Sequence, residues 1–216
     1  ANGTETDSII FTTNATEWQG IRFVNVQMDG DVKSEISYAR IEKSKANGGG
    51  EYNKGGAIYL DNTSELLLTN SEIKENSASN YGGGIYNKGS LEIQNSIITN
   101  NSCKYGGGIY NEGVMHLNNS GICNNTASSY GGGLYSSSNT NVINCNIAGN
   151  SCNSQGGGLY IQGNVNIINS TITDNFGKFR GGGIYASGGD IVKIYNSTVA
   201  NNSSGTDYYH YGGGIY

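Results

Sequence analysis

Residues 82–86 read Gly-Gly-Gly-Ile-Tyr, and close copies of this pentapeptide recur along most of the chain. The motif, Gly-Gly-(Gly/Ala)-(Ile/Leu)-Tyr, occurs seven times, with steps of 27, 24, 25, 25, 25 and 31 residues between successive tyrosines. A period in this range is typical of a solenoid, in which each copy forms one coil stacked on the coil before it. The motif tyrosines are Tyr59, Tyr86, Tyr110, Tyr135, Tyr160, Tyr185 and Tyr216.

A second motif, Asn-(Ser/Cys)-x-(Ile/Val)-x-x-Asn, follows the glycine motif, and apolar residues such as Leu91 and Ile93 alternate between the two. Alternation indicates β-strand, and repeated glycine triplets disfavour helix. Each coil is therefore predicted to contain three short strands, with Ile85, Ser96 and Ile98 also facing inward. We expect the closing asparagines to stack in a hydrogen-bonded ladder at a bend where they adopt left-handed backbone. They are Asn76, Asn101, Asn125, Asn150, Asn175 and Asn202.

The repeat predicts a single all-β domain over residues 1–216, a parallel solenoid of about eight coils. Its coils are irregular over 1–54 and regular over 55–216, and residues 36–46 align with residues 68–78 of the next coil. Leucine-rich repeats have a similar period but lack the glycine triplet, and propeller blades are longer. A β-solenoid fits better than either.

Charge is sparse, with 13% charged residues and a net charge of −5. The chain lacks the basic stripe that nucleic-acid binding requires, and it has no apolar run of 18 residues that would predict a membrane span. Proline is absent, which fits interior strands that donate hydrogen bonds to both neighbours. A composition rich in Asn, Ser and Thr and poor in Lys is typical of secreted or cell-surface proteins, so we expect an extracellular or cell-surface location.

The glycine motif with its downstream asparagine resembles the repeats of the right-handed parallel β-helix superfamily, the pectate-lyase-like solenoids. The form Gly-Gly-(Ala/Gly)-Ile is most similar to the repeats of polymorphic outer-membrane proteins and related adhesins. The segment from Trp18 to Phe23 resembles the first coils of secreted β-helix surface proteins. This resemblance implies a right-handed helix. It says less about activity, because the superfamily includes polysaccharide lyases and hydrolases as well as adhesins and inert fibres.

No catalytic constellation emerges from the columns of residues one period apart. Glu92 and His116 are the one acid–histidine neighbour pair that can be constructed, and no nucleophile or second carboxylate joins them. Asp61, Lys88 and Glu112 alternate in charge, which predicts an exposed ladder of surface ion pairs rather than a site.

No metal site or cofactor is expected. Residues 29–31, Asp-Gly-Asp, fit a turn better than a calcium site, and the cysteine spacing does not suggest zinc. Cys103 and Cys152 occupy a small-residue column and Cys145 an inward serine column, while Cys123 lies offset from Cys145. Because these separations are too long for disulfides, four free thiols are predicted.

Asn-x-Ser/Thr sequons are dense, and Asn14, Asn62, Asn118 and Asn124 are candidate glycosylation sites. A second tyrosine column precedes the glycines. The favoured interpretation is that the glycines serve turns and the tyrosines stack for stability. The alternative is that the two columns wall a shallow, glycine-floored trough that takes a glycan chain or a neighbouring fibre. Candidates for ligand binding or self-association are Tyr59, Tyr81, Tyr86, Tyr105, Tyr110, Tyr130, Tyr135, Tyr160 and Tyr185.

The sequence ends within a motif at Tyr216, and joining it to Ala1 of another copy would mimic the internal run 181–188. Residues 206–211 are expected to form a loop insertion. Open solenoid ends expose strand edges, so the unit is expected to continue in a longer polypeptide or to dock head to tail into a fibre.

The function favoured by the sequence is an extracellular structural or adhesive element without catalysis. Its expected partners are further copies of itself, a cell surface or a glycan, and not nucleic acid. Two alternatives stay open: a polysaccharide-degrading lyase or hydrolase, and a glycan-binding module.

Overall fold

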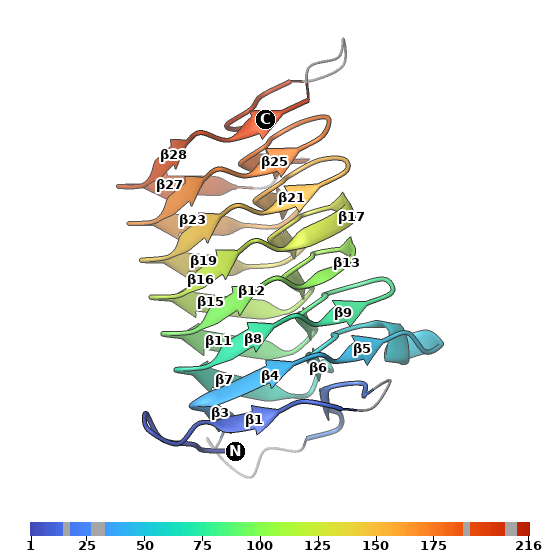
Figure 1. The fold of residues 1–216 in the computed structure, drawn as a ribbon. Helices are drawn as coiled ribbons and strands as arrows, with labels where there is room; N and C mark the ends of the chain where they lie inside the picture. The colour runs from blue at the N-terminus through green and yellow to red at the C-terminus, as the bar shows by residue number, and fades with distance from the viewer. Residues whose placement is uncertain (15–17, 27–32, 188–190, 206–210) are drawn as a thin grey trace.

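The computed structural model describes residues 1–14, 18–26, 33–187, 191–205 and 211–216. They wind into a parallel β-solenoid whose coils stack from one end of the molecule to the other, with the N-terminus at one end and the C-terminus at the other (Figure 1). One short 3-10 turn, η1 (Gly50–Asn53), projects from the side of an N-terminal coil.

Each regular coil contributes one strand to each of four sheets, which are numbered in the order that a coil visits them. Sheet 1 contains β2 (Ile21–Phe23), β6 (Ile58–Leu60), β10 (Ile85–Asn87), β14 (Ile109–Asn111), β18 (Leu134–Ser136), β22 (Leu159–Ile161) and β26 (Ile184–Ala186). Sheet 2 contains β3 (Ser34–Ser37), β7 (Glu65–Thr69), β11 (Ser90–Gln94), β15 (Val114–Asn118), β19 (Thr140–Ile143), β23 (Val165–Ile168) and β27 (Val192–Tyr195).

Sheets 3 and 4 complete the coil. Sheet 3 contains β1 (Ile9–Phe11), β4 (Ala39–Glu42), β8 (Glu72–Lys74), β12 (Ile97–Thr99), β16 (Gly121–Cys123), β20 (Asn146–Ala148), β24 (Thr171–Thr173) and β28 (Thr198–Ala200). Sheet 4 contains β5 (Lys45–Ala46), β9 (Ser77–Ala78), β13 (Ser102–Tyr105), β17 (Thr126–Tyr130), β21 (Ser151–Cys152), β25 (Phe176–Gly177) and β29 (Ser203–Ser204).

The prediction of a parallel β-solenoid is confirmed, but two of its details change. Each regular coil has four strands rather than three, because the residues after the closing asparagine also pair with their neighbours, as Ser102 does with Ser77. Sheets 1, 2 and 4 each contain seven stacked strands, which are separated by about six turns in the described residues. The expected number of eight coils was therefore slightly too high.

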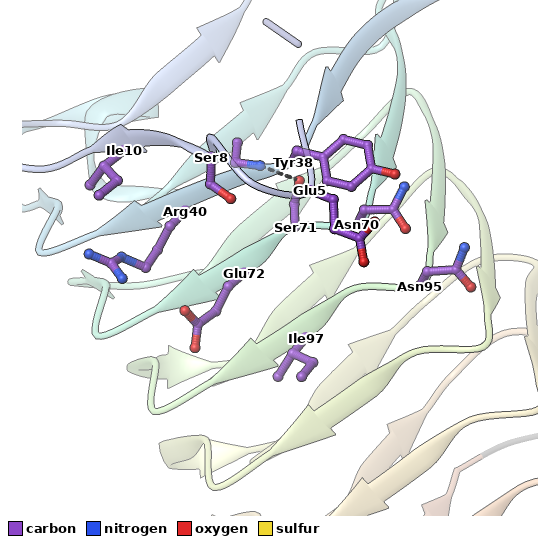
Figure 2. A pocket seen from close by; sticks show the side chains of 11 residues that line it. Glu5, Ser8, Ile10, Tyr38, Arg40, Asn70, Ser71, Glu72, Asn95 and Ile97 are labelled. Atoms are coloured by element: carbon purple, nitrogen blue, oxygen red, sulfur yellow. Dashed lines mark hydrogen bonds between the residues drawn. The ribbon is translucent and has the colours of Figure 1, made fainter. Parts of the chain in front are cut away.

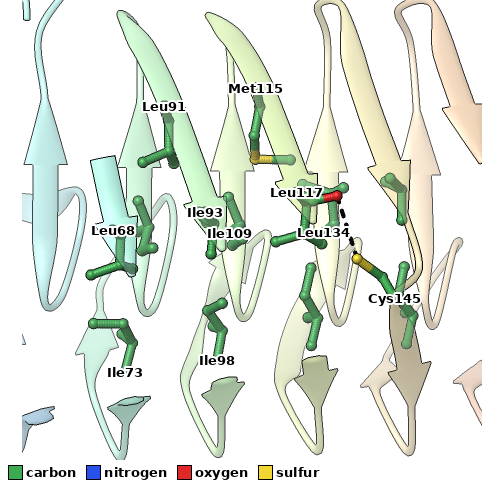
Figure 3. Close-up of a cluster of buried hydrophobic side chains, with 14 of the residues drawn as sticks. Leu68, Ile73, Leu91, Ile93, Ile98, Ile109, Met115, Leu117, Leu134 and Cys145 are labelled. Carbon is green, nitrogen blue, oxygen red and sulfur yellow. Dashed lines mark hydrogen bonds between the residues drawn. The ribbon is translucent and has the colours of Figure 1, made fainter. Parts of the chain in front are cut away.

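The core is a set of apolar columns running along the solenoid. Ile85 pairs in register with Ile109, and Ile109 with Leu134, as the period predicts. Figure 3 shows Ile109 and Leu134 in this column, and two further columns in which Leu91 lies beside Met115 and Ile73 beside Ile98. The side chains are fully buried, and each contributes about 1.5–3 kcal/mol relative to an exposed side chain.

The closing asparagines form the predicted ladder. In Asn101, both the backbone N–H and Nδ2 donate to Oδ1 of Asn125 at 3.0 Å, and Nδ2 also donates to the carbonyl of Ile73 at 2.9 Å. Asn125 repeats this pattern toward Asn150. Each buried amide is thus satisfied by the neighbouring coils, which makes the ladder a strong constraint on register. The ladder contains Asn76, Asn101, Asn125, Asn150, Asn175 and Asn202.

The left-handed backbone lies elsewhere than expected. It occurs at the asparagine that opens the second motif, as at Asn95 with φ of 49°, and at the residue before the closing asparagine, as at Asn100 with φ of 55°. The closing residue is not among the positive-φ residues, because its amide must point into the core to join the ladder. The exposed turn residues therefore adopt the left-handed conformation, whereas the buried closing asparagine does not.

A serine ladder lies one bend earlier in the coil. The backbone N–H of Ser71 donates to Oγ of Ser96, and that of Ser96 donates to Oγ of Ser120, both at 3.1 Å. Cys145 takes the next place, as predicted from its column. Its own N–H donates to Oγ of Ser170 at 3.0 Å.

The glycines allow the strands of sheets 1 and 4 to approach closely at their shared bend. A Cβ on Gly83 would lie 2.3 Å from the carbonyl oxygen of Gly107 and 2.6 Å from that of Ser102. Gly82 has a φ of +65°, which side chains rarely tolerate. The triplet is therefore required by backbone contact between coils.

The N-terminal coils are irregular but stay in register. β2 pairs with β6, which places Arg22 beside Tyr59, and Ile36 and Ile41 pair with Leu68 and Ile73 as the alignment predicted. Large aromatic side chains pack against this end of the core. They are Phe11, Trp18 and Phe23.

Candidate functional site

Sheet 1 presents one outward side chain per coil, the tyrosine of the glycine motif. Because the register is constant, these rings stack nearly parallel along the solenoid. The centroids of Tyr86 and Tyr110 are 5.5 Å apart with an interplanar angle of 8°, and those of Tyr110 and Tyr135 are 4.5 Å apart at 13°. Such separations lie within the range of favourable aromatic pairs. The motif-tyrosine column contains Tyr59, Tyr86, Tyr110, Tyr135, Tyr160, Tyr185 and Tyr216.

The second tyrosine column leans over the first. Tyr81 stacks on Tyr105 at 5.3 Å, and its ring edge also meets Tyr110 at 4.8 Å. Tyr105 stacks on Tyr130 at 5.7 Å, and Tyr130 contacts Tyr160 at 5.0 Å. The two columns therefore form one continuous aromatic surface.

The alternative of a trough with a glycine floor is wrong. The glycines are buried beneath the neighbouring coils, and Tyr86 is only 1% exposed because the second column covers it. A shallow hollow of about 260 Å³ remains between the columns, with Tyr105, Tyr130, Tyr135 and Gln162 among its lining residues. Inside the columns the ring faces contact one another, so a ligand in this hollow meets ring edges and hydroxyl groups.

Several tyrosine hydroxyls donate to acceptors at the edge of the columns. Tyr86 donates to Glu112 at 2.7 Å, and Tyr135 donates to Gln162 at 2.5 Å. Burial, together with the Glu112 carboxylate, holds the pKa of Tyr86 well above its usual range. Burial, with Tyr160 close by, raises the pKa of Tyr135 to about 12. These phenols stay protonated at neutral pH.

One end of the motif-tyrosine column is closed by Arg22. Its guanidinium lies 4.2 Å from the ring centroid of Tyr59 and 5.2 Å from that of Tyr52, and it donates to the carbonyls of Glu51 and Lys54. Tyr59 donates to the Glu51 carboxylate at 2.6 Å, and this hydrogen bond lowers the pKa of Glu51. The loop that carries η1 thus holds the first ring of the column in place.

Glu92 and His116 lie side by side on the outer face of sheet 2, as predicted. Glu92, however, is held by other partners: Gln94 donates to it at 2.7 Å and Lys33 at 3.1 Å, and both bonds lower its pKa. The Nδ1 atom of His116 lies 3.0 Å from the amide nitrogen of Asn141. The geometry places an ionised carboxylate beside an imidazole on an open sheet face rather than in a cleft.

The expected ladder of Asp61, Lys88 and Glu112 does not form. Asp61 is buried at a turn and accepts hydrogen bonds from Asn25 N–H and from Ser64 Oγ, at 2.6 and 2.7 Å. Burial by itself would raise the pKa of Asp61, but these bonds outweigh it and hold the pKa at about 2. Glu112 binds Tyr86 instead. Because Asp61 and Glu112 accept these hydrogen bonds, neither carboxylate pairs with Lys88.

Another hollow, of about 560 Å³, lies on the outer face of sheet 3 near the N-terminal end (Figure 2). Arg40 and Glu72 lie on neighbouring strands there, below Ile10. Both of these side chains have a partner of opposite charge, since Arg40 lies 3.1 Å from Glu42 and Glu72 lies 3.6 Å from Lys74. This surface is a structural ion-pair cluster around the buried Glu42 carboxylate.

All four cysteines are free, as predicted. Cys103 lies in register with Ala127, and Ala127 with Cys152. Burial raises the pKa of Cys103 to about 12 and that of Cys152 to about 11. Because the thiolate is the reactive form, these are inert structural thiols.

Among the predicted glycosylation sites, Asn14, Asn62 and Asn124 are exposed, whereas Asn118 is half-buried within β15. Whether any of them carries a glycan stays a prediction. The candidate turn at residues 29–31 lies outside the described residues, as does most of the insertion at 206–211. Within the described ranges, no three His, Cys, Asp or Glu side chains gather in a way that could hold a metal ion.

Sequence reasoning missed several residues of the aromatic surface. Arg22 could have been found from its alignment with Tyr59 in the degenerate first motif, since register places the two side by side. Glu51 and Gln162 gave no such signal, because one lies in a non-periodic loop and the other in a column without constant chemistry. A buried pair, Asn87 and Asn111, also escaped notice, although both follow a motif tyrosine directly; Asn87 Nδ2 donates to Asn111 Oδ1 at 2.7 Å.

The fold and its ladders define a repeat protein of the parallel β-solenoid class. Residues 26–216 match a family model described as the right-handed beta helix region, and this match covers most of the sequence. The chain therefore belongs to the right-handed β-helix family, as its motifs suggested. No curated protein and no solved structure matches it. In the described part of the chain, no helix is long and apolar enough to cross a membrane.

Proposed function

We propose that this chain is an extracellular structural or adhesive solenoid that acts through its surface and not through catalysis. The observation that carries the proposal is the use of the repeated residues. The asparagines, serines and tyrosines that recur in each coil bind their equivalents in the next coil. A repeat whose recurring side chains bind one another from coil to coil provides a rigid, elongated scaffold.

The environment of the acidic residues supports the same proposal. Glu92 is neutralised by Lys33, Glu112 accepts from a buried phenol, and Asp61 fixes a turn. A general acid needs a raised pKa, and the pKa values of Glu92 and Asp61 are lowered. The likeness to adhesin repeats and the density of sequons support a cell-surface or secreted setting.

Incubation with acidic polysaccharides, with and without calcium, tests the absence of catalysis. We expect no new reducing ends and no unsaturated products. Turnover that disappears in Glu92→Gln or His116→Ala, but persists in the control Glu72→Gln on another sheet, would replace this proposal with the polysaccharide-degrading alternative. Adhesion is measured in parallel, as retention of protein-coated beads on cells or on immobilised glycans.

A glycan-binding module is the second candidate, and the hollow between the tyrosine columns favours it. Ring edges, hydroxyls and the Gln162 amide offer hydrogen bonds beside apolar surface, as sugars require. Replacing Gln162 with Ala and Tyr130 with Phe changes the lining while leaving the buried rings in place. Loss of binding on a glycan array would support this function, and unchanged binding would locate the adhesive surface elsewhere.

Head-to-tail self-association stays a prediction. Sedimentation velocity over a range of concentrations, with electron microscopy of the same samples, tests it directly. Rods that lengthen with concentration would support a fibre, and a single short particle at every concentration would contradict it.

A further inference from the structure

The tyrosine columns bring oxidisable rings into contact over many coils. Successive rings of the motif-tyrosine column have centroids 4.5 to 5.5 Å apart from Tyr59 to Tyr216. The second column adds a parallel connection, since Tyr130 contacts Tyr160 and Tyr81 contacts Tyr110. Electron exchange between aromatic rings falls steeply with separation, so rings in direct contact are suited to it.

Proton acceptors lie at one end of the columns. Oxidation of a neutral phenol by one electron produces a strong acid, so the step is favourable where a base can accept the hydroxyl proton. Tyr86 donates to the Glu112 carboxylate at 2.7 Å, and Tyr59 donates to Glu51 at 2.6 Å. Glu112 is exposed and can pass a proton to water. These are hydrogen bonds of the length at which proton transfer takes place.

We propose that the two tyrosine columns form a relay for single-electron oxidation along the solenoid, with Tyr86 as its resting position. A one-electron oxidant, such as an organic or metal-centred radical, removes an electron from a ring and is itself reduced. The electron vacancy then passes from ring to ring as a radical cation, in which each intermediate phenol keeps its hydroxyl proton. At Tyr86 the hydroxyl proton moves to Glu112, which leaves a neutral tyrosyl radical and a protonated carboxyl group.

Charge near the end of the relay favours Tyr86 over Tyr59. The Arg22 guanidinium, 4.2 Å from the Tyr59 centroid, opposes added positive charge there. Lys54 lies 4.9 Å from the Tyr86 centroid, but the Glu51 carboxylate neutralises it at 3.1 Å. An electron vacancy that is created several coils away is therefore expected to come to rest at Tyr86.

The experiment uses the full chain with a ruthenium polypyridyl photosensitiser on Arg180→Cys, since the native Arg180 lies 4.9 Å from the ring centroid of Tyr216, which stacks on Tyr185. The native thiols are replaced by the residue types of neighbouring coils, which keeps the columns intact. The replacements are Cys103→Ala, Cys123→Thr, Cys145→Ser and Cys152→Ala. After a flash with an electron acceptor in solution, electron paramagnetic resonance of freeze-quenched samples detects the tyrosyl radical, which needs no access of a reagent to the buried Tyr86 ring. Comparison with Tyr86→Phe and Tyr59→Phe assigns the signal, which is expected from Tyr86.

Phenylalanine breaks the relay without breaking the stack, because it keeps the ring and removes the oxidisable phenol. Tyr135→Phe interrupts the first column and Tyr105→Phe the second, so each single variant keeps one route and retains the Tyr86 radical signal. The double variant is expected to lose it. The pair Tyr52→Phe and Tyr195→Phe, away from both routes, is the matched control. Glu112→Gln is expected to move the radical from Tyr86 to Tyr59, since a neutral amide is not a base.

The outcomes separate the relay from simple solution oxidation. A Tyr86 radical signal in the double variant at the level of the parent chain would overturn the proposal, as would a radical confined to Tyr216 and Tyr185 in the parent chain. Circular dichroism of each variant verifies that the solenoid is intact.

Discussion

The N-terminal coils and the regular repeats fill the same positions of the solenoid with different residues. In the repeats, Asn101 binds Asn125 and Tyr86 stacks on Tyr110, so each side chain is satisfied by its own copy. In the N-terminal coils, Ser44 donates to the first asparagine of the ladder and Arg22 covers the first ring of the motif-tyrosine column. A repeat stabilises itself internally, but its first coil needs residues of another kind.

The largest expected effect tests the interior of the asparagine ladder. Asn125→Leu removes the acceptor for two donors of Asn101 and the donor to the carbonyl of Ile98. Because each unsatisfied buried group costs about 1–3 kcal/mol, the free energy of unfolding should fall by about 3–5 kcal/mol. Denaturant titration measures it.

Ser44→Ala, at the start of the same ladder, is the matched variant. The backbone N–H of Ser44 still donates to Asn76, so the expected loss is only about 1 kcal/mol. Equal losses at Ser44 and Asn125 would show that the ladder stabilises its end as much as its interior, contrary to the comparison.

The next effect concerns the aromatic end of the core. Trp18 packs against the core, and its Nε1 donates to the carbonyl of Glu42 at 3.1 Å. Trp18→Ala should lower the free energy of unfolding by about 2–3 kcal/mol, since the side chain is only partly buried. Val192 lies in β27, at the C-terminal end of the solenoid. Val192→Ala should lower the free energy of unfolding by about 1 kcal/mol. A larger loss of stability for Val192→Ala than for Trp18→Ala would mean that the C-terminal end of the core contributes more stability than the N-terminal end.

Arg22 is expected to matter more than Arg180, although both lie over tyrosine rings. Arg22 adds hydrogen bonds to two carbonyls, while Arg180 lies 4.9 Å from the Tyr216 centroid. Arg22→Met should cost about 1–2 kcal/mol and Arg180→Met less than about 1 kcal/mol. Thermal unfolding of both variants gives the comparison. An equal loss would mean that ring contact alone accounts for the effect.

The last effect is a dependence on pH at the junction of the two regions. Asp61 accepts from Asn25 N–H, and its pKa is about 2 in the folded state against about 3.9 in an unfolded chain. A depressed pKa contributes stability that is complete above about pH 4 and is lost as the pH falls toward about 2. Asp61→Asn should reduce this acid sensitivity. Identical acid titrations of the two proteins would contradict the assignment.

The sequence predicted the columns well because the period alone determines which residues are neighbours. Ile85, Cys103 and Glu92 lie beside the residues that one-period spacing assigns to them. The fourth strand was missed because a two-residue segment such as Ser77–Ala78 is too short to show alternation. The period predicts which residues are adjacent, but it does not predict how deeply each side chain is buried.

The aromatic surface was harder to predict for that reason. The depth of Tyr86 depends on the tilt of Tyr81, which the period does not specify. The carboxylate of Asp61 accepts a hydrogen bond from Asn25, which is 36 residues away and therefore not one 25-residue period from it. A contact between residues that are not one period apart cannot be predicted from the repeat and requires a three-dimensional structure.

The one-strand-per-sheet winding has a mechanical consequence. Each coil is joined to the next by a single covalent crossing, and hydrogen bonds between coils run along the long axis. Under tension between the two ends, coils would detach singly, and each would release about 80–90 Å of extended chain for its 25 residues. Such a tether lengthens in equal steps at nearly constant force, which lets it absorb a sudden pull without breaking.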